Sequence, residues 1–299
     1  MTAVTLLDGG LGQEITKRSG KSAHALWSVK VMMEQPAIVE DVHRAFLDAG
    51  ADALTVNSYT TTPSRLARNG FPEWFDDAQQ LALRLVNNAR DQADRPVQVT
   101  GCLPPLVATY VTEESKPYEG SLEEYRKICA HQGAQVDVMF IETIGIIAEA
   151  MAAIDAAKET GKPVYLGYTI SDDGSNTLRS GERLEEAAEA AAERGVAGIM
   201  INCSIPEAVT SAMPILAKTG VRFGGYANGF TSIEALRPGG NVDSLEARKD
   251  LNPEAYGKFV RQWLDHGASI IGGCCEVGPQ HIAYLNKMLN DENVERQAL

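Results

Sequence analysis

Short apolar runs alternate with longer stretches of helical periodicity along this chain of 299 residues. Most of the runs are continuously apolar, which is typical of parallel strands covered on both faces. We expect eight strands: Val4–Leu7, Ala53–Val56, Val97–Gly101, Val138–Ile141, Val164–Tyr168, Gly198–Ile201, Arg222–Tyr226 and Ser269–Gly272. Eight evenly repeated units predict an α/β fold in which residues 1–299 form one domain, a single (β/α)8 barrel.

The stretches between the strands are rich in alanine and leucine and predict helices. The expected helices are Ile38–Asp48, Asp76–Asp94, Leu122–Ala134, Ile147–Thr160, Arg183–Arg194, Pro206–Thr219, Glu254–His266 and Pro279–Asn290. A doubly wound sheet is the alternative, but no Gly-x-Gly-x-x-Gly pattern follows the first strand. The polar tail after Asn290 is expected to be frayed.

Loop lengths differ between the two ends of the expected barrel. Helix-to-strand links are short, whereas several strand-to-helix links are long: residues 57–75, 102–121, 171–182 and 227–253. Long loops after the carboxyl ends of barrel strands build the active-site face. Chemically active residues at strand ends are therefore the candidates for function.

The charge balance bears on possible partners. Forty acidic residues outnumber 27 lysines and arginines, which gives a net charge of −13. Such a chain repels phosphate backbones and anionic lipid, so we expect neither nucleic acid nor a membrane as partner. The first residues, Met-Thr-Ala-Val-Thr-Leu-Leu-Asp, do not resemble a signal peptide, and we expect a cytoplasmic protein. The five cysteines are then expected to stay reduced, which favours metal or catalytic roles.

Three cysteines follow strand ends. Cys203 follows the sixth expected strand, and Cys274 and Cys275 follow the eighth. Both strands end on the same rim, so three thiolates could meet at one zinc ion and leave its fourth position open. Neighbouring strand residues face opposite sides, and the preceding Gly272-Gly273 would let the chain leave strand geometry. The alternatives are buried hydrophobic cysteines, or an accidental or disulfide-bonded vicinal pair.

The chemistry of three thiolates differs from that of histidine-bound zinc. Zinc with three thiolates carries a net negative charge, which favours binding and deprotonating a substrate thiol over making hydroxide. This indicates alkyl transfer onto sulfur. One alternative is a zinc hydrolase or lyase, which needs histidines at strand ends; the sequence places none there. The other is a non-catalytic thiol barrel, a metal store or redox sensor that uses Cys274 and Cys275.

Several motifs together resemble the homocysteine S-methyltransferase family nearly end to end. The most specific is Gly-Gly-Cys-Cys at residues 272–275, paired with Asn202-Cys203 upstream. The others are Leu7-Asp8-Gly9-Gly10, residues 43–59, Phe140-Ile141-Glu142-Thr143, Ser180-Gly181-Glu182, Tyr226-Ala227-Asn228 and Pro279-Gln280-His281-Ile282.

The resemblance implies a zinc-dependent (β/α)8 barrel that moves a methyl group onto the thiol of homocysteine and so forms methionine. It implies that Cys203, Cys274 and Cys275 hold Zn²⁺. It also implies that Asp8 and Glu142 bind the amino end of the thiol substrate and that Asn228 can occupy the open zinc position before substrate arrives. Both carboxylates follow strands, where an ammonium group would find charge-assisted hydrogen bonds. The alternatives are a turn or cap role for Asp8 and a helix N-terminal charge for Glu142.

The methyl donor is expected to be a small molecule with a positive centre. A methyl group leaves a sulfonium or quaternary ammonium readily because displacement neutralises the charge, and aromatic faces can hold such cations. The candidate aromatic residues near the rim are Trp27, Tyr59, Tyr110, Tyr118 and Tyr226. Cys129 is expected in a helix core, and Cys102 is a possible neighbour of the site.

Overall fold

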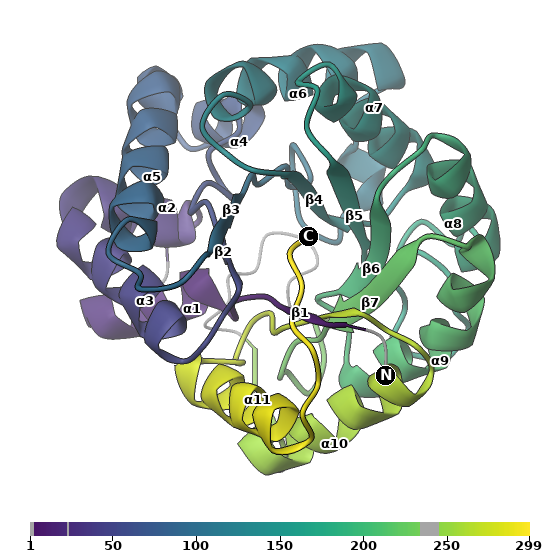
Figure 1. Ribbon diagram of the computed structural model, residues 1–299. Helices are drawn as coiled ribbons and strands as arrows, with labels where there is room; N and C mark the ends of the chain where they lie inside the picture. The colour runs from purple at the N-terminus through teal and green to yellow at the C-terminus, as the bar shows by residue number, and fades with distance from the viewer. Residues whose placement is uncertain (1–2, 23, 234–244) are drawn as a thin grey trace.

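A ring of parallel strands surrounded by helices forms the centre of the computed structural model (Figure 1), which describes residues 3–22, 24–233 and 245–299. The strands are β1 (Thr5–Leu6), β2 (Ala53–Thr55), β3 (Gln98–Thr100), β4 (Met139–Ile144), β5 (Val164–Tyr168), β6 (Gly198–Asn202), β7 (Arg222–Tyr226) and β8 (Ile270–Ile271). Each lies within or overlaps one expected run, so the eight predicted strands are confirmed.

The strands pair in an order that closes the ring. One parallel ladder runs β1-β8-β7-β6-β5-β4, and a second joins β2 to β3. A parallel bridge between Thr100 and Val138 connects β3 to β4. Between β1 and β2, the Asp52 N–H donates to the Leu6 carbonyl oxygen at 2.7 Å. The fold is therefore the expected (β/α)8 barrel.

Helices cover the outside of the ring. They are α1 (Leu11–Ser19), α2 (Trp27–Glu34), α3 (Pro36–Asp48), α4 (Pro63–Arg68), α5 (Phe75–Arg90), α6 (Tyr118–Gln132), α7 (Ile147–Lys158), α8 (Leu184–Glu193), α9 (Pro206–Leu216), α10 (Pro253–Asp265) and α11 (Pro279–Asp291). Single 3-10 turns occur at η1 (Pro72–Trp74), η2 (Thr112–Glu114) and η3 (Ala217–Thr219). Helices α1, α2 and α4 are not among the expected helices. These helices have six to nine residues, which is too short for helical periodicity to stand out.

Aromatic side chains fill part of the barrel interior. The Phe140 ring lies 6.0 Å from the rings of both Tyr165 and Tyr226, measured between centroids. These rings pack in one buried cluster with apolar residues of the neighbouring strands, including Met200 and Ile270. The interior is thus a packed core below the rim that carries the long loops.

The C-terminal tail is ordered, contrary to the expectation of fraying. It leaves α11 and crosses the ring of strands (Figure 1). The Gln297 N–H donates to the Val4 carbonyl oxygen at 3.0 Å, and the Leu299 N–H donates to Gln98 Oε1 at 2.6 Å. Gln98 begins β3, so the tail covers the end of the barrel opposite the long loops. Composition alone could not predict this docking, because it depends on contacts with residues far away in the sequence, such as the ion pair of Arg296 with Asp52 at 2.7 Å.

Two further points concern the chain as a whole. No described helix is long and apolar enough to cross a membrane. The expected loop 227–253 includes residues 234–244, which lie outside the described ranges. Its described ends pair through an antiparallel bridge between Phe230 and Ala247.

Candidate active site

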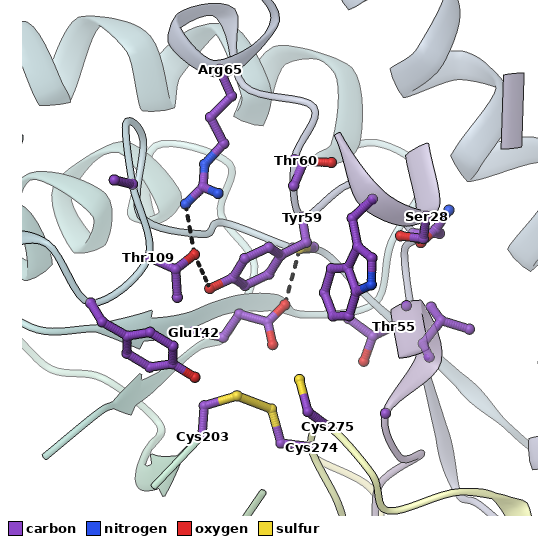
Figure 2. A pocket seen from close by; sticks show the side chains of 18 of the residues that line it. Ser28, Thr55, Tyr59, Thr60, Arg65, Thr109, Glu142, Cys203, Cys274 and Cys275 are labelled. Carbon is purple, nitrogen blue, oxygen red and sulfur yellow. Dashed lines mark hydrogen bonds between the residues drawn. A yellow bond between two sulfur atoms is a disulfide. The ribbon is translucent and has the colours of Figure 1, made fainter. Parts of the chain in front are cut away.

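A cavity of about 610 Å³ opens where the carboxyl ends of the strands meet. Residues directly after β1, β3, β6 and β8 line it, together with residues of the loops that follow β2 and β3. This is the face of the barrel that the long strand-to-helix loops predicted. Figure 2 shows that the three predicted cysteines lie together on one wall of this cavity.

The sulfur atoms of Cys203, Cys274 and Cys275 all lie within 4.8 Å of one another. Three sulfurs around one tetrahedral zinc ion would lie roughly 3.8 Å apart, given zinc–sulfur bonds of about 2.3 Å. The cluster is therefore compact enough for its three sulfurs, once reduced, to bind one metal ion, and thiolate donors suit zinc. No histidine joins this cluster in the part of the chain that the structure describes, so the ligands that a zinc hydrolase would need are not there.

Two of these sulfurs are joined in the structure. Cys203 and Cys274 form a disulfide with a Cα–Cα distance of 5.7 Å, whereas Cys275 is free. The expectation that all five cysteines are reduced is therefore wrong for this state of the protein, and the vicinal pair is not the bonded one. The physical reason is proximity: backbone positions that bring two sulfurs to one metal also fall in the distance range of a disulfide. A metal needs both sulfurs reduced.

Close packing explains the two glycines before Cys274. A Cβ atom on Gly272 would lie 2.6 Å from Leu7 Cβ, and one on Gly273 would overlap the Val277 side chain. Neither glycine has a positive φ angle. The expectation that they provide backbone freedom is therefore replaced by a spatial reason, since Gly272 packs against the residues that follow β1 and Gly273 packs against Val277.

Asp8 follows β1 and is 5% exposed. Its carboxylate accepts hydrogen bonds from the Thr55 N–H at 2.8 Å and from the Thr55 hydroxyl at 3.0 Å. Burial raises the pKa of Asp8 to about 7, although the hydrogen bonds from Thr55 oppose this shift. The carboxylate thus links β1 to β2 and lines the cavity. A turn or cap role alone does not describe these contacts.

Glu142 lies in β4 and also lines the cavity. Its carboxylate accepts a hydrogen bond from the Cys102 thiol at 3.0 Å. Burial raises the pKa of Glu142 to about 7, and the Cys102 thiol partly opposes this rise. Cys102, which the sequence indicates as a possible neighbour of the site, is thus in direct contact with Glu142. Asp8 and Glu142 therefore both lose their protons only near neutral pH. A cation bound beside them would favour their ionised forms.

Asn228 follows β7 but is not among the residues that line the cavity. Its side chain is fully buried, and its Oδ1 accepts a hydrogen bond from the Phe230 N–H at 3.1 Å. Its own N–H donates to the Ser204 carbonyl oxygen at 3.0 Å, which keeps it beside the Cys203 segment. Its Nδ2 has no hydrogen-bond partner among the described residues. Its role at the metal stays a prediction.

Four of the five candidate aromatic residues line the cavity: Trp27, Tyr59, Tyr110 and Tyr226. Tyr118 is the exception, because it begins α6 and its hydroxyl donates to Asp155 at 2.6 Å on the outside of the barrel. Trp27 Nε1 and the Tyr226 hydroxyl are buried and lack a hydrogen-bond partner within the described chain. Buried donors are rarely left unpaired, so both groups are available to donate to a ligand in the cavity.

Arg65 also lines the cavity, although it is not among the site residues predicted from the sequence. The preceding Thr62-Pro63 begins α4, and the Thr62 hydroxyl accepts a hydrogen bond from the Arg65 N–H. The guanidinium points into the cavity and donates to Thr109 Oγ1 at 3.0 Å (Figure 2). A signal was present, because Arg65 lies in the long loop 57–75 that was expected to build the active-site face. Cys129 is buried in α6, as predicted.

The fold and this cluster define a (β/α)8 barrel with a thiol-rich active-site face. A family model described as homocysteine S-methyltransferase matches residues 5–289. The chain therefore belongs to the homocysteine S-methyltransferase family, as its motifs suggested.

Individual relatives agree with this assignment. The homocysteine S-methyltransferase of Escherichia coli is 28% identical to this chain over 94% of each protein. The selenocysteine methyltransferase of Astragalus bisulcatus is 26% identical and covers 95% of this chain and 92% of the relative. The solved oxidized form of the homocysteine methyltransferase MmuM from Escherichia coli superposes with a TM-score of 0.80 at 25% identity, covering 95% of this chain and 96% of that one. Its metallated form gives 0.79 at 24% identity, covering 96% of each.

Proposed function

We propose that the protein is a zinc-dependent homocysteine S-methyltransferase that takes a methyl group from a small sulfonium or quaternary-ammonium donor and forms methionine. The observation that carries the proposal is the sulfur cluster of Cys203, Cys274 and Cys275, which shares one cavity with the carboxyl groups of Asp8 and Glu142. The matching family supports this activity. The whole of 1–299 would act as one domain in the cytoplasm, with small molecules as its partners.

The cysteines would hold the metal and the carboxylates would hold the acceptor. Zinc bound by Cys203, Cys274 and Cys275 would keep the acceptor sulfur in its thiolate form near neutral pH. The ammonium group of homocysteine would lie between Asp8 and Glu142 and hold both in their ionised forms. Asn228 lies beside the Cys203 segment because its N–H donates to the Ser204 carbonyl oxygen. Its predicted role is to occupy the open zinc position before the substrate arrives.

The transfer itself needs no further general base. The acceptor sulfur attacks the methyl carbon in line, and the bond from that carbon to the donor sulfur or nitrogen breaks. Its electron pair stays on the leaving atom, which becomes neutral, while the thiol proton passes to solvent. The protein contributes by holding the two reactants together. The aromatic face of Trp27 in the cavity wall would stabilise the positive centre before transfer.

The decisive experiment replaces Cys203 and Cys275 by serine in separate variants. Each is expected to lose bound zinc and to form methionine at least a hundredfold more slowly, roughly the loss that follows removal of a central catalytic group. Cys129→Ala is the matched control, because Cys129 is buried in α6 outside the cluster. S-methylmethionine, S-adenosylmethionine and betaine are tried as donors with homocysteine. Full zinc occupancy and full activity in both serine variants would contradict the proposal.

The Cys203–Cys274 disulfide favours one second candidate, a thiol barrel that senses redox state without catalysis. The two functions differ in freshly purified protein. A sensor would contain no zinc, would turn over no donor, and would lose the mass of two hydrogen atoms on mild oxidation. If the reduced protein contains zinc and forms methionine, the sensor is excluded and the methyltransferase is supported.

A further inference from the structure

Arg65 is a buried cation without an acidic partner. Its side chain is 9% exposed, and it forms no ion pair within the described chain. The other arginine buried at this level, Arg179, faces Asp172 at 3.3 Å. The charge of Glu149 acts on Arg65, but the two side chains form no ion pair. The Glu149 carboxylate instead accepts hydrogen bonds from the Leu106 N–H and from the hydroxyl groups of Ser115 and Tyr125. Burying a charge without a counter-charge is costly, so this arrangement calls for a reason.

One side of the guanidinium is unused. Nε and Nη2 donate to the Pro105 carbonyl oxygen at 3.1 and 2.8 Å, and Nη2 also donates to Thr109 Oγ1 at 3.0 Å. Nη1 has no hydrogen bond to any residue that the structure describes. These bonds, together with the position of Arg65 in α4, fix the guanidinium group in the cavity wall. The free Nη1 donors are therefore pre-organised for an anionic oxygen.

The position of Arg65 separates it from the acceptor site. Figure 2 shows its guanidinium and the sulfur cluster on opposite sides of the cavity, with Tyr59 and Glu142 between them. The acceptor's carboxylate shares one carbon with its ammonium group and must stay beside the acidic pair. An anion at Arg65 therefore belongs to the second reactant.

We propose that Arg65 is a specificity-determining residue that binds the carboxylate of the methyl donor, while the positive methyl-bearing centre lies at the other end of that donor. This inference rests on the proposed methyl transfer. The guanidinium already lies 5.4 Å from the Tyr59 ring centroid, so a second cation at that end would be repelled. The carboxylate end is thus drawn to Arg65 and the methyl end is left to the sulfur cluster. After transfer, the product is a neutral thioether or tertiary amine that retains its carboxylate.

The test compares two donors of nearly equal shape. (Carboxymethyl)dimethylsulfonium carries the carboxylate, and (2-hydroxyethyl)dimethylsulfonium replaces it with a hydroxymethyl group. The wild-type protein is expected to prefer the first donor, by kcat/KM, by roughly a hundredfold, as expected for a buried charge pair. Arg65→Met is expected to abolish this preference, and Arg65→Lys to keep part of it. The ratio between donors within one preparation does not depend on how much of a variant folds.

A matched control and a binding measurement make the outcomes separable. Arg126→Met changes an exposed arginine of α6 that pairs with Glu159 outside the cavity, and it should keep the wild-type preference. Calorimetric binding of both donors, with and without homocysteine, needs no turnover. If no donor is turned over but the binding preference exists and disappears in Arg65→Met, the proposed function fails, whereas carboxylate binding by Arg65 is still supported. If methyl transfer occurs without preference, or if Arg65→Met raises only the KM of homocysteine, the inference is overturned.

Discussion

Asn202 and Thr143 are joined by two reciprocal hydrogen bonds, each 2.8 Å long. Asn202 ends β6 and Thr143 lies in β4, so the contact passes over the intervening strand β5. It can do so because β5 has glycine at position 167, where a Cβ atom would lie 2.8 Å from Asn202 Oδ1. The pair directly adjoins Cys203 on one strand and Glu142 on the other. It therefore fixes the sulfur cluster relative to the carboxylate that is proposed to bind the acceptor.

Removing this link is expected to weaken both the fold and the site. Asn202→Ala leaves the buried Thr143 N–H and hydroxyl without their partners, which costs about 2–4 kcal/mol of unfolding free energy. The KM of homocysteine should rise as Glu142 loses its alignment. Urea denaturation measures the first effect and steady-state kinetics the second. Asn88→Ala, on the exposed face of α5, should change neither the free energy of unfolding nor the KM. An unchanged free energy of unfolding in Asn202→Ala would show that this link does not stabilise the fold.

The sequence predicted the barrel well because eight apolar runs recur with one rhythm. Each run is covered by helices on one side and by the core on the other, so nearly all of its residues are apolar and the run can be recognised from its composition. The sulfur cluster was predictable for a related reason: in a barrel, the carboxyl ends of all strands meet on one rim. Knowing that Cys203 and Cys274 follow strands was enough to bring them together.

Contacts made by single side chains across the cavity could not be predicted in this way. Arg65 and Thr109 are 44 residues apart and meet only because two long loops fold over the same cavity. The hydrogen bond between Cys102 and Glu142 likewise depends on side-chain direction at two strand ends. Composition and periodicity carry information about burial, but not about which polar atom meets which.

The raised pKa of Glu142 predicts how stability depends on pH. The folded protein keeps the Glu142 proton up to about pH 7, whereas the unfolded chain loses it near pH 4.3. Folding therefore binds a proton between these values, and this group makes stability fall as the pH rises from about 4 to 7. Glu142→Gln removes the effect. It should be more stable than the wild type by roughly 1–3 kcal/mol at about pH 8 and equally stable at about pH 4.

Urea denaturation at the two pH values measures this difference, with both proteins in the same metal state. Glu159→Gln is the control, because Glu159 is exposed and Arg126 lowers its pKa; no gain at high pH is expected there. The same Glu142→Gln variant should bind methionine, which carries the ammonium group without the thiol, more weakly. A Glu142→Gln protein that is less stable than wild type at high pH would refute the assignment of a buried, costly carboxylate.

The Cys102 thiol is predicted to tune this carboxylate rather than to react. Burial and the nearby Glu142 hold the pKa of Cys102 well above its usual range, so the group stays a thiol and a hydrogen-bond donor. Cys102→Ala removes the donor and should raise the pKa of Glu142 further. Methionine binding, followed by calorimetry, should then reach half its full strength at a higher pH. Cys102→Ser supplies a hydroxyl donor and should restore the wild-type profile; an identical profile in all three proteins would refute the tuning.

Zinc uptake is predicted to require reduction of the Cys203–Cys274 disulfide. Metal binding needs deprotonated thiols, and the disulfide removes two of the three sulfurs that lie within 4.8 Å of one another. Protein kept oxidised should bind no zinc at the cluster, whereas treatment with dithiothreitol, which gives up two electrons and two protons to the disulfide, should restore one zinc per chain and methyl transfer together. Cys203→Ser cannot form this disulfide, so its residual zinc affinity should not respond to the reductant. Metal analysis of gel-filtered protein provides the measurement, and equal zinc content before and after reduction of the wild type would exclude these cysteines as the metal site.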